Sequence, residues 1–163
     1  MLRDTLSILE HAVKSVDQYK LVTANVKLED EILKISGTKK KDGIEIKLDK
    51  IVKKRIVAFG KASLAMASAF ATIVDIDEGI VVIPHGQGGE RPPGMDIIEA
   101  EHPVPAQGSL TAANRVLKMA EKSTESDLLF ALISGGGSSL VAKPVDGITL
   151  EENIEGTHQL LKS

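Results

Sequence analysis

Four short apolar runs constrain the fold of this chain most strongly. They lie at 56–59, 80–83, 96–100 and 128–133, with intervals long enough for a helix or a long loop between them. The run Ile80–Ile83 is apolar at every position, so it offers no polar face to water. Strands of this kind, alternating with helices, are typical of a parallel sheet that is covered on both faces. We therefore predict an α/β fold with a doubly wound, mostly parallel sheet.

Helical patterns lie between these runs and at the C-terminal end. A helix-prone stretch runs from Lys61 to Val74, and apolar residues recur at three- and four-residue steps between 109 and 123. Thr149 and Glu152 have the spacing of a capping box, in which each side chain bonds the backbone amide of the other residue. We therefore expect a final helix that ends at about Lys162.

The first 55 residues have a different character. Residues 26–36 and 44–48 alternate apolar and polar side chains, which is typical of a small antiparallel hairpin with one face on a core. The lysine run 39–41 is interpreted as a solvated turn of this hairpin. Residues 3–20 are predicted to form an N-terminal helix. Its apolar face consists of Leu6, Leu9, Val13 and Val16.

Formal charge changes at the same point in the chain. It is +4 over residues 1–55 and −7 over residues 56–163. We therefore predict two domains, a helix and hairpin layer at 1–55 and a Rossmann-like α/β domain at 56–163.

Composition excludes several classes of function. The chain has 163 residues and no cysteine, which excludes disulfides, thiolate–zinc sites and thiol nucleophiles. One Tyr, three Phe and a net charge of −3 argue against a nucleic-acid partner, because such proteins use stacking rings and a basic surface. The longest nearly apolar run, Leu64–Val74, is shorter than the about 20 residues of a membrane span. We therefore expect no membrane partner, and the absence of a signal-peptide pattern leads us to expect a cytoplasmic protein.

The predicted sheet directs attention to four loops. In open α/β sheets, ligands bind outside the carboxyl ends of the strands. The loops that follow the predicted strands are Gly60–Ser63, His85–Gly94, His102–Gly108 and Ser134–Ser139.

The last of these loops is rich in glycine. Consecutive glycines are costly in conformational entropy, so they indicate a backbone that approaches a ligand closely with its N–H groups. The alternative is a tight turn that requires a positive φ angle. The spacing fits neither the dinucleotide fingerprint nor the P-loop. The candidate anion-binding residues are Ser134, Gly135, Gly136, Gly137, Ser138 and Ser139.

Lys61 is the candidate catalytic residue. It lies at the start of a predicted helix, where a positive charge is unfavourable by roughly 0.3–1 kcal/mol. An anion held between its ammonium group and the helix amides would remove this conflict, so Gly60 and Ser63 are candidate binding residues beside it. Lys61 could then bind a carboxylate or phosphate, or stabilise a transferring phosphoryl group. The alternative is an exposed lysine that extends into solvent.

Two histidines follow predicted strands. Pro103 restricts the backbone of His102, and a stiff loop at the end of a strand suits a preorganised polar contact. His102 is therefore a further candidate binding residue, with an ordinary surface histidine as the alternative. His85 has the same position after its strand. No set of residues has a convincing metal-ligand spacing, so the metal ligands stay unknown.

Taken together, these motifs resemble the glycerate 2-kinases of the MOFRL type. The resemblance covers about residues 54–163, and the motifs occur in the same order. They are Val57–Ser63 with Met66 and Ala67, Glu99–Pro105, Leu132–Leu140, Pro144 and Gly147–Leu150.

The resemblance implies an activity and a site. The expected reaction is ATP-dependent phosphorylation of D-glycerate at its 2-hydroxyl, which gives 2-phosphoglycerate, with ATP and a divalent cation such as Mg²⁺. Lys61 matches the active-site lysine of the family, and Ser134–Ser139 matches its ligand loop. In such proteins the site lies in a cleft between an N-terminal α/β domain and a C-terminal domain.

Two features depart from the family. Ala106 stands where the family has an acidic residue, so a carboxylate role is absent at that position. The chain ends at Ser163, where the family continues into its C-terminal domain. We therefore expect an N-terminal portion that is incomplete alone, with the missing domain or a second copy as its partner. The alternative function is a non-catalytic module that binds an anion or a nucleotide.

Overall fold

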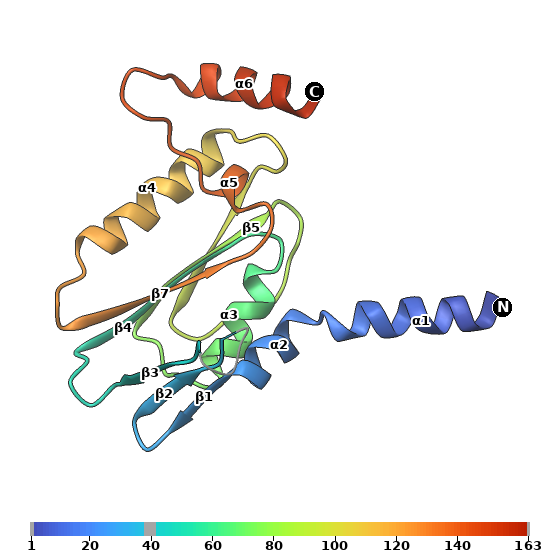
Figure 1. Ribbon diagram of the computed structural model, residues 1–163. Coiled ribbons are helices and arrows are strands. Elements are labelled where there is room, and N and C mark those ends of the chain that lie inside the picture. The colour runs from blue at the N-terminus through green and yellow to red at the C-terminus, as the bar shows by residue number, and fades with distance from the viewer. Residues whose placement is uncertain (1, 38–41, 163) are drawn as a thin grey trace.

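The computed structural model describes residues 2–37 and 42–162 (Figure 1). The turn expected at 39–41 lies outside these residues. In chain order the elements are α1 (Leu2–Ser15), α2 (Gln18–Asn25), β1 (Val26–Glu29), β2 (Ile32–Ile35), β3 (Ile44–Lys47), β4 (Lys53–Phe59), α3 (Ser63–Ala71), β5 (Glu78–Pro84), β6 (Met95–Ala100), α4 (Gln107–Glu121), β7 (Asp127–Ile133), α5 (Gly137–Leu140) and α6 (Leu150–Lys162).

Four strands form the parallel sheet that the apolar runs predict. Their spatial order is β6-β5-β4-β7, and every neighbouring pair is parallel. Successive side chains of a strand point to opposite faces of a sheet. Accordingly, Ile56 packs in the cluster that contains Phe70 of α3, and Val57 packs in the cluster that contains Met119 of α4. Both faces of the sheet are therefore covered, and the predicted fold class is confirmed.

The hairpin layer is also confirmed, with one additional turn. Strands β1, β2 and β3 form an antiparallel sheet in that order. The sequence predicted one extended segment over 26–36, but Asp30 and Glu31 divide it, with φ angles of 48° and 62°. Positive φ angles at two successive residues are typical of a tight hairpin turn. No glycine marks this turn, which is why the pattern missed it.

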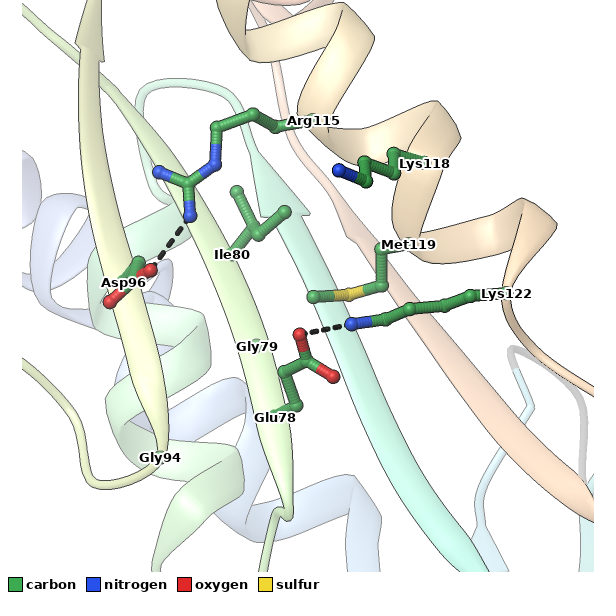
Figure 2. A pocket seen from close by; sticks show the side chains of 9 residues that line it. All are labelled: Glu78, Gly79, Ile80, Gly94, Asp96, Arg115, Lys118, Met119 and Lys122. Carbon is green, nitrogen blue, oxygen red and sulfur yellow. Dashed lines mark hydrogen bonds and ion pairs between the residues drawn. The ribbon is translucent and has the colours of Figure 1, made fainter.

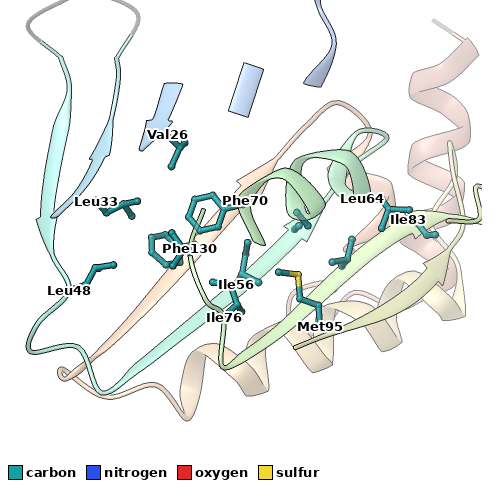
Figure 3. Packing of buried hydrophobic residues seen from close by; sticks show 14 residues of the cluster. Val26, Leu33, Leu48, Ile56, Leu64, Phe70, Ile76, Ile83, Met95 and Phe130 are labelled. Carbon is teal, nitrogen blue, oxygen red and sulfur yellow. The ribbon is translucent and has the colours of Figure 1, made fainter. Parts of the chain in front are cut away.

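The small sheet shares a hydrophobic core with the parallel sheet. Leu33 and Leu48 are buried in the same cluster as Phe70 and Phe130 (Figure 3). The two aromatic rings lie with their centroids 4.7 Å apart. Residues of both predicted domains thus pack together, and the division at residue 55 stays a prediction.

The single helix expected over residues 3–20 is wrong. Asp17 is extended, with a ψ angle of 112°, and its Oδ1 accepts a hydrogen bond from the Lys20 amide at 3.1 Å. It therefore caps a new helix, α2, and separates it from α1. On α1, Leu6, Leu9 and Val13 are 51%, 59% and 62% exposed. The helix extends away from the rest of the chain (Figure 1).

Helix α6 begins with the predicted capping box. The Thr149 amide donates to Glu152 Oε2 at 2.7 Å, and the Glu152 amide donates to Thr149 Oγ1 at 3.1 Å. Among the described helices, none is both long enough and apolar enough to span a membrane.

Candidate functional site

The four parallel strands end at one edge of their sheet. Phe59, Pro84, Ala100 and Ile133 are the last residues of β4, β5, β6 and β7 in that order. Ligands of open α/β sheets bind outside this edge. The loops that follow these four residues therefore form the candidate site.

The loops after β4 and β7 are joined through their backbones. The Lys61 amide donates to the Gly135 carbonyl at 2.9 Å, and the Ala62 amide donates to Ser134 Oγ at 3.0 Å. Gly60 has a φ angle of 120°, and a Cβ atom there would lie 2.2 Å from Ser134 Oγ. Only glycine fits such a position. These contacts fix the backbone of Lys61, whose side chain is exposed.

Gly136 lies close to the side chains of both His102 and Lys61. A Cβ atom on Gly136 would lie 2.8 Å from the Nε2 and Cδ2 atoms of His102 and 3.4 Å from Cγ of Lys61. The φ angle of Gly136 is 89°, which also favours glycine. The structure thus brings together residues from the loops after β4, β6 and β7, three of the four predicted loops.

The glycine loop also offers backbone donors. The Gly136 carbonyl accepts hydrogen bonds from the Leu140 amide at 3.3 Å and from Ser139 Oγ at 3.0 Å. Within the described residues, the amides of Gly135, Gly136 and Ser138 have no hydrogen-bond acceptor. Neighbouring backbone N–H groups of this kind can bind an anion.

Two of the predicted binding residues have a structural role. The side chain of Ser63 is fully buried, and its hydroxyl donates to the Val82 carbonyl at 2.7 Å, which attaches α3 to β5. Ser139 is also buried, and its hydroxyl donates within the glycine loop. Both hydroxyls donate inside the fold, and a ligand role for these two residues stays a prediction.

Gln87 is a contributor that the sequence reasoning missed. Its Nε2 donates to the Lys61 carbonyl at 3.0 Å. The Lys61 amide is bonded to the β7 loop, so both backbone polar groups of this residue are held by neighbouring loops. Gln87 lies in the loop His85–Gly94 after β5, from which no residue was named as a candidate binding residue. Its place at the carboxyl end of a strand is the signal that could have identified it.

Glu101 supports the loop that carries His102. Its carboxylate accepts hydrogen bonds from the amides of Gly108 at 3.4 Å and Ser109 at 3.1 Å, at the start of α4. Burial raises the pKa of Glu101, but the backbone hydrogen bonds outweigh burial and hold the pKa below its usual value. His85 lies 3.6 Å from the Glu101 carboxylate and 3.3 Å from that of Glu99. Ala106 provides no side-chain cap, so Glu101 holds this helix start.

The comparison with known proteins now bears on this site. The profile of DUF4147, described as a domain of unknown function, matches residues 4–163. The chain belongs to the DUF4147 family. A crystal structure of a protein from Pyrococcus horikoshii has a TM-score of 0.83 and 34% identity, over 99% of this DUF4147 chain and 35% of that one.

Two further relatives carry names that refer to three-carbon acids. A glycerate 2-kinase from Pyrococcus horikoshii is 37% identical over 158 residues, which are 97% of this chain and 34% of that protein. A protein from Agrobacterium vitis named for hydroxypyruvate reduction is 43% identical over 111 residues, which are 66% of this chain and 28% of that protein. The DUF4147 chain therefore spans about a third of the length of these relatives. The resemblance to the N-terminal portion of glycerate 2-kinases is confirmed.

Proposed function

We propose that this chain forms one wall of the active site of a glycerate 2-kinase. The reaction would transfer the terminal phosphoryl group of ATP to the 2-hydroxyl of D-glycerate, giving 2-phosphoglycerate. The observation that carries the proposal is that His102 and Lys61 both lie close to Gly136, which brings three loops together at the carboxyl edge of the sheet, where ligands of such sheets bind. The name of the Pyrococcus horikoshii relative supports the choice of reaction.

The residues of this wall suit phosphoryl transfer. That reaction depends on positioning and charge neutralisation more than on covalent chemistry. The Lys61 ammonium would neutralise charge on a transferring phosphoryl group or on the carboxylate of glycerate. The amides of Gly135 and Gly136 would donate to oxygens of the same anion, and the His102 imidazole would hydrogen bond to the ligand beside them.

A divalent cation fits this wall less well. Among the described residues, no group of three or more His, Asp or Glu side chains could hold a metal ion. The available donors are an ammonium group, an imidazole and backbone amides, which bind anions rather than Mg²⁺. We therefore assign no step of the reaction to a metal ion on this chain.

The second wall is proposed to come from another polypeptide segment. This chain covers 34% of the Pyrococcus horikoshii kinase, and its candidate site is open on the solvent side of Lys61, whose side chain is exposed. A segment equivalent to the remainder of that relative, or a second copy of this chain, would close the site. Catalysis by the isolated chain is then expected to be absent.

A binding measurement tests the first part of this proposal. We expect ATP or D-glycerate to shift the amide NMR signals of Gly135 and Gly136 in a saturable way. Lys61→Ala should remove the response, and Lys50→Ala, which removes an exposed lysine outside the site, should leave it unchanged. Equal responses in the two variants would contradict the assignment of Lys61.

A turnover assay tests the second part. ADP release with D-glycerate should appear only when the chain is mixed with the remaining segment of the Pyrococcus horikoshii relative. Binding without turnover in this mixture would favour a non-catalytic anion-binding module. Reduction of hydroxypyruvate by the mixture would favour the chemistry named for the Agrobacterium vitis relative, and turnover by the isolated chain would contradict its incompleteness.

A further inference from the structure

A second charged hollow lies at the opposite end of the sheet from Lys61. It has a volume of about 340 Å³ and lies between α4 and the first residues of β5 and β6 (Figure 2). Glu78 begins β5 and Asp96 is near the start of β6, so the hollow is at the amino ends of these strands. It shares no residue with the candidate site at their carboxyl ends.

One face of α4 supplies three cations to this hollow. Arg115, Lys118 and Lys122 are spaced by three and four positions, which places them on the same side of a helix. Figure 2 shows the three side chains extending from α4 toward the strands. Arg115 Nη2 lies 2.7 Å from Asp96 Oδ2, and Lys122 Nζ forms an ion pair with Glu78.

The two carboxylates of the hollow are each shared with a further arginine. Arg91 Nη2 lies 2.9 Å from Asp96 Oδ1. Arg55 Nε lies 3.5 Å from Glu78 Oε2, is buried and makes no hydrogen bond. Each carboxylate therefore already has two cationic neighbours, and neither is available to neutralise another charge.

Lys118 is the cation of the hollow that has no carboxylate partner among the described residues. Among the described residues its ammonium group makes no hydrogen bond or ion pair. Arg55 also pairs with Asp127, at 2.6 Å, so five cations are set against three carboxylates in and around the hollow. This excess of positive charge occurs in a chain whose net charge is −3.

The floor of the hollow strengthens its attraction for an anion. Ile80 and Met119 line it, and each is only 3% exposed. Apolar side chains at the floor lower the local dielectric constant, so the surrounding charges act on an ion there more strongly than they do in open water.

We propose that this hollow binds a small anion that carries a phosphate group, with Lys118 as the main unpaired contact and Arg115 and Lys122 on either side. Its size fits a compact phosphate ester or free phosphate rather than a nucleic acid or a protein segment. The proposal does not rest on the kinase function, because it uses none of the residues of that site. A ligand in this hollow would lie at the amino ends of strands β5 and β6, at the opposite end of the sheet from Lys61.

A titration with inorganic phosphate at constant ionic strength tests this site. We expect saturable shifts of the Gly79 and Gly94 amide signals, since both residues line the hollow. Lys118→Met should weaken the affinity about tenfold, the value of one charge-assisted contact. Lys50→Met, a matched change at an exposed lysine elsewhere, should leave it unchanged.

The same titration separates the two sites of the chain. Lys61→Ala should leave the Gly79 and Gly94 response intact, while a response confined to Gly60 and Gly135 would overturn the proposal. Lys118 also lies in the last turn of α4, where a cation offsets the helix dipole. If Lys118→Met lowered thermal stability but bound phosphate as tightly as the wild type, that structural role would be its only one. A second titration, with a compact phosphate ester, then shows whether the hollow binds the ester or free phosphate more tightly.

Discussion

Replacement of Gly136 by alanine is the most direct test of how the candidate site is assembled. The side chains of His102 and Lys61 both lie close to Gly136, and the φ angle of Gly136, 89°, lies in the left-handed region. A side chain at this position must therefore adopt an unfavourable backbone conformation and also displace two neighbours. Two other glycines of the chain allow these effects to be measured separately.

The backbone cost can be measured at Gly147. Its φ angle is 91°, almost that of Gly136, and a Cβ atom there would meet nothing within 4 Å. A left-handed conformation costs an L-residue roughly 1–2 kcal/mol. We expect Gly147→Ala to lower the free energy of unfolding by that amount. Gly135→Ala has neither a positive φ angle nor a close neighbour, so it should change the stability by less than about 0.5 kcal/mol.

Gly136→Ala should show the backbone cost together with a packing cost. Its Cβ would lie 2.8 Å from the His102 ring and 3.4 Å from Lys61 Cγ. Overpacking typically adds about 1–3 kcal/mol, so the expected total is about 2–5 kcal/mol. For a chain of this length, each kcal/mol lowers Tm by roughly 2–4 °C, which gives a decrease of roughly 4–20 °C.

Thermal and urea unfolding, monitored by circular dichroism, measure these differences in stability. The NMR signals of the His102 ring should move in Gly136→Ala and stay unchanged in Gly147→Ala. The reasoning fails if the two variants have equal stability and equal His102 signals, because His102 would then not lie close to Gly136. Loss of anion binding in Gly135→Ala with full binding in Gly136→Ala would also refute it.

Three further predictions concern the rest of the chain. Ser63→Ala removes the buried hydrogen bond to Val82 and should destabilise the chain by about 1–2 kcal/mol in urea unfolding. Hydrogen bonds from Thr124, and then from Arg55, lower the pKa of Asp127 from 3.8 to about 2. The stabilisation from Asp127 is therefore complete above pH 3.8 and is lost as the pH falls through about 2, so Asp127→Asn should flatten the pH dependence of the urea midpoint in that interval. Thr149→Ala removes one half of the capping box and should increase amide exchange in the first turn of α6, for a cost of about 1 kcal/mol.

Each of these has an outcome that would contradict it. A Ser63→Ala variant as stable as the wild type would show that the hydroxyl has no structural role. An acid midpoint equally steep in Asp127→Asn would assign the transition to other carboxylates. Unchanged exchange after Thr149→Ala, with Thr157→Ala as the control further along α6, would show that the cap is not needed.

The sheet and its ligand-binding edge could be predicted because they depend on patterns of short range. A strand that is buried on both faces must be apolar at successive positions, as Ile80–Ile83 is, and parallel pairing then places the following loops at one edge. The loops that carry Lys61, His102 and Gly136 were all found in this way. Predicting that these loops contact one another requires the spatial order of the strands, which the periodicity of the sequence does not give.

The features that the sequence missed depend on side-chain direction and tertiary contacts. Whether the hydroxyl of Ser63 faces a ligand or a neighbouring strand depends on how α3 is rotated against β5. The role of Gln87 depends on the path of a loop that has no periodicity. The turn at Asp30 and Glu31 uses residues that rarely adopt positive φ angles, so local propensity pointed away from it.

The joining of the β4 and β7 loops has a consequence for how the chain folds. Ala62 and Ser134 are separated by 72 positions in sequence, yet their hydrogen bond joins two loops of the candidate site. Contacts of such long range form late, because the entropy of closing the intervening segment must be lost first. A chain still emerging from the ribosome therefore contains α3, β5 and β6 before the candidate site beside Lys61 can form. A ligand that binds this site would stabilise only chains in which the β4 and β7 loops have already met.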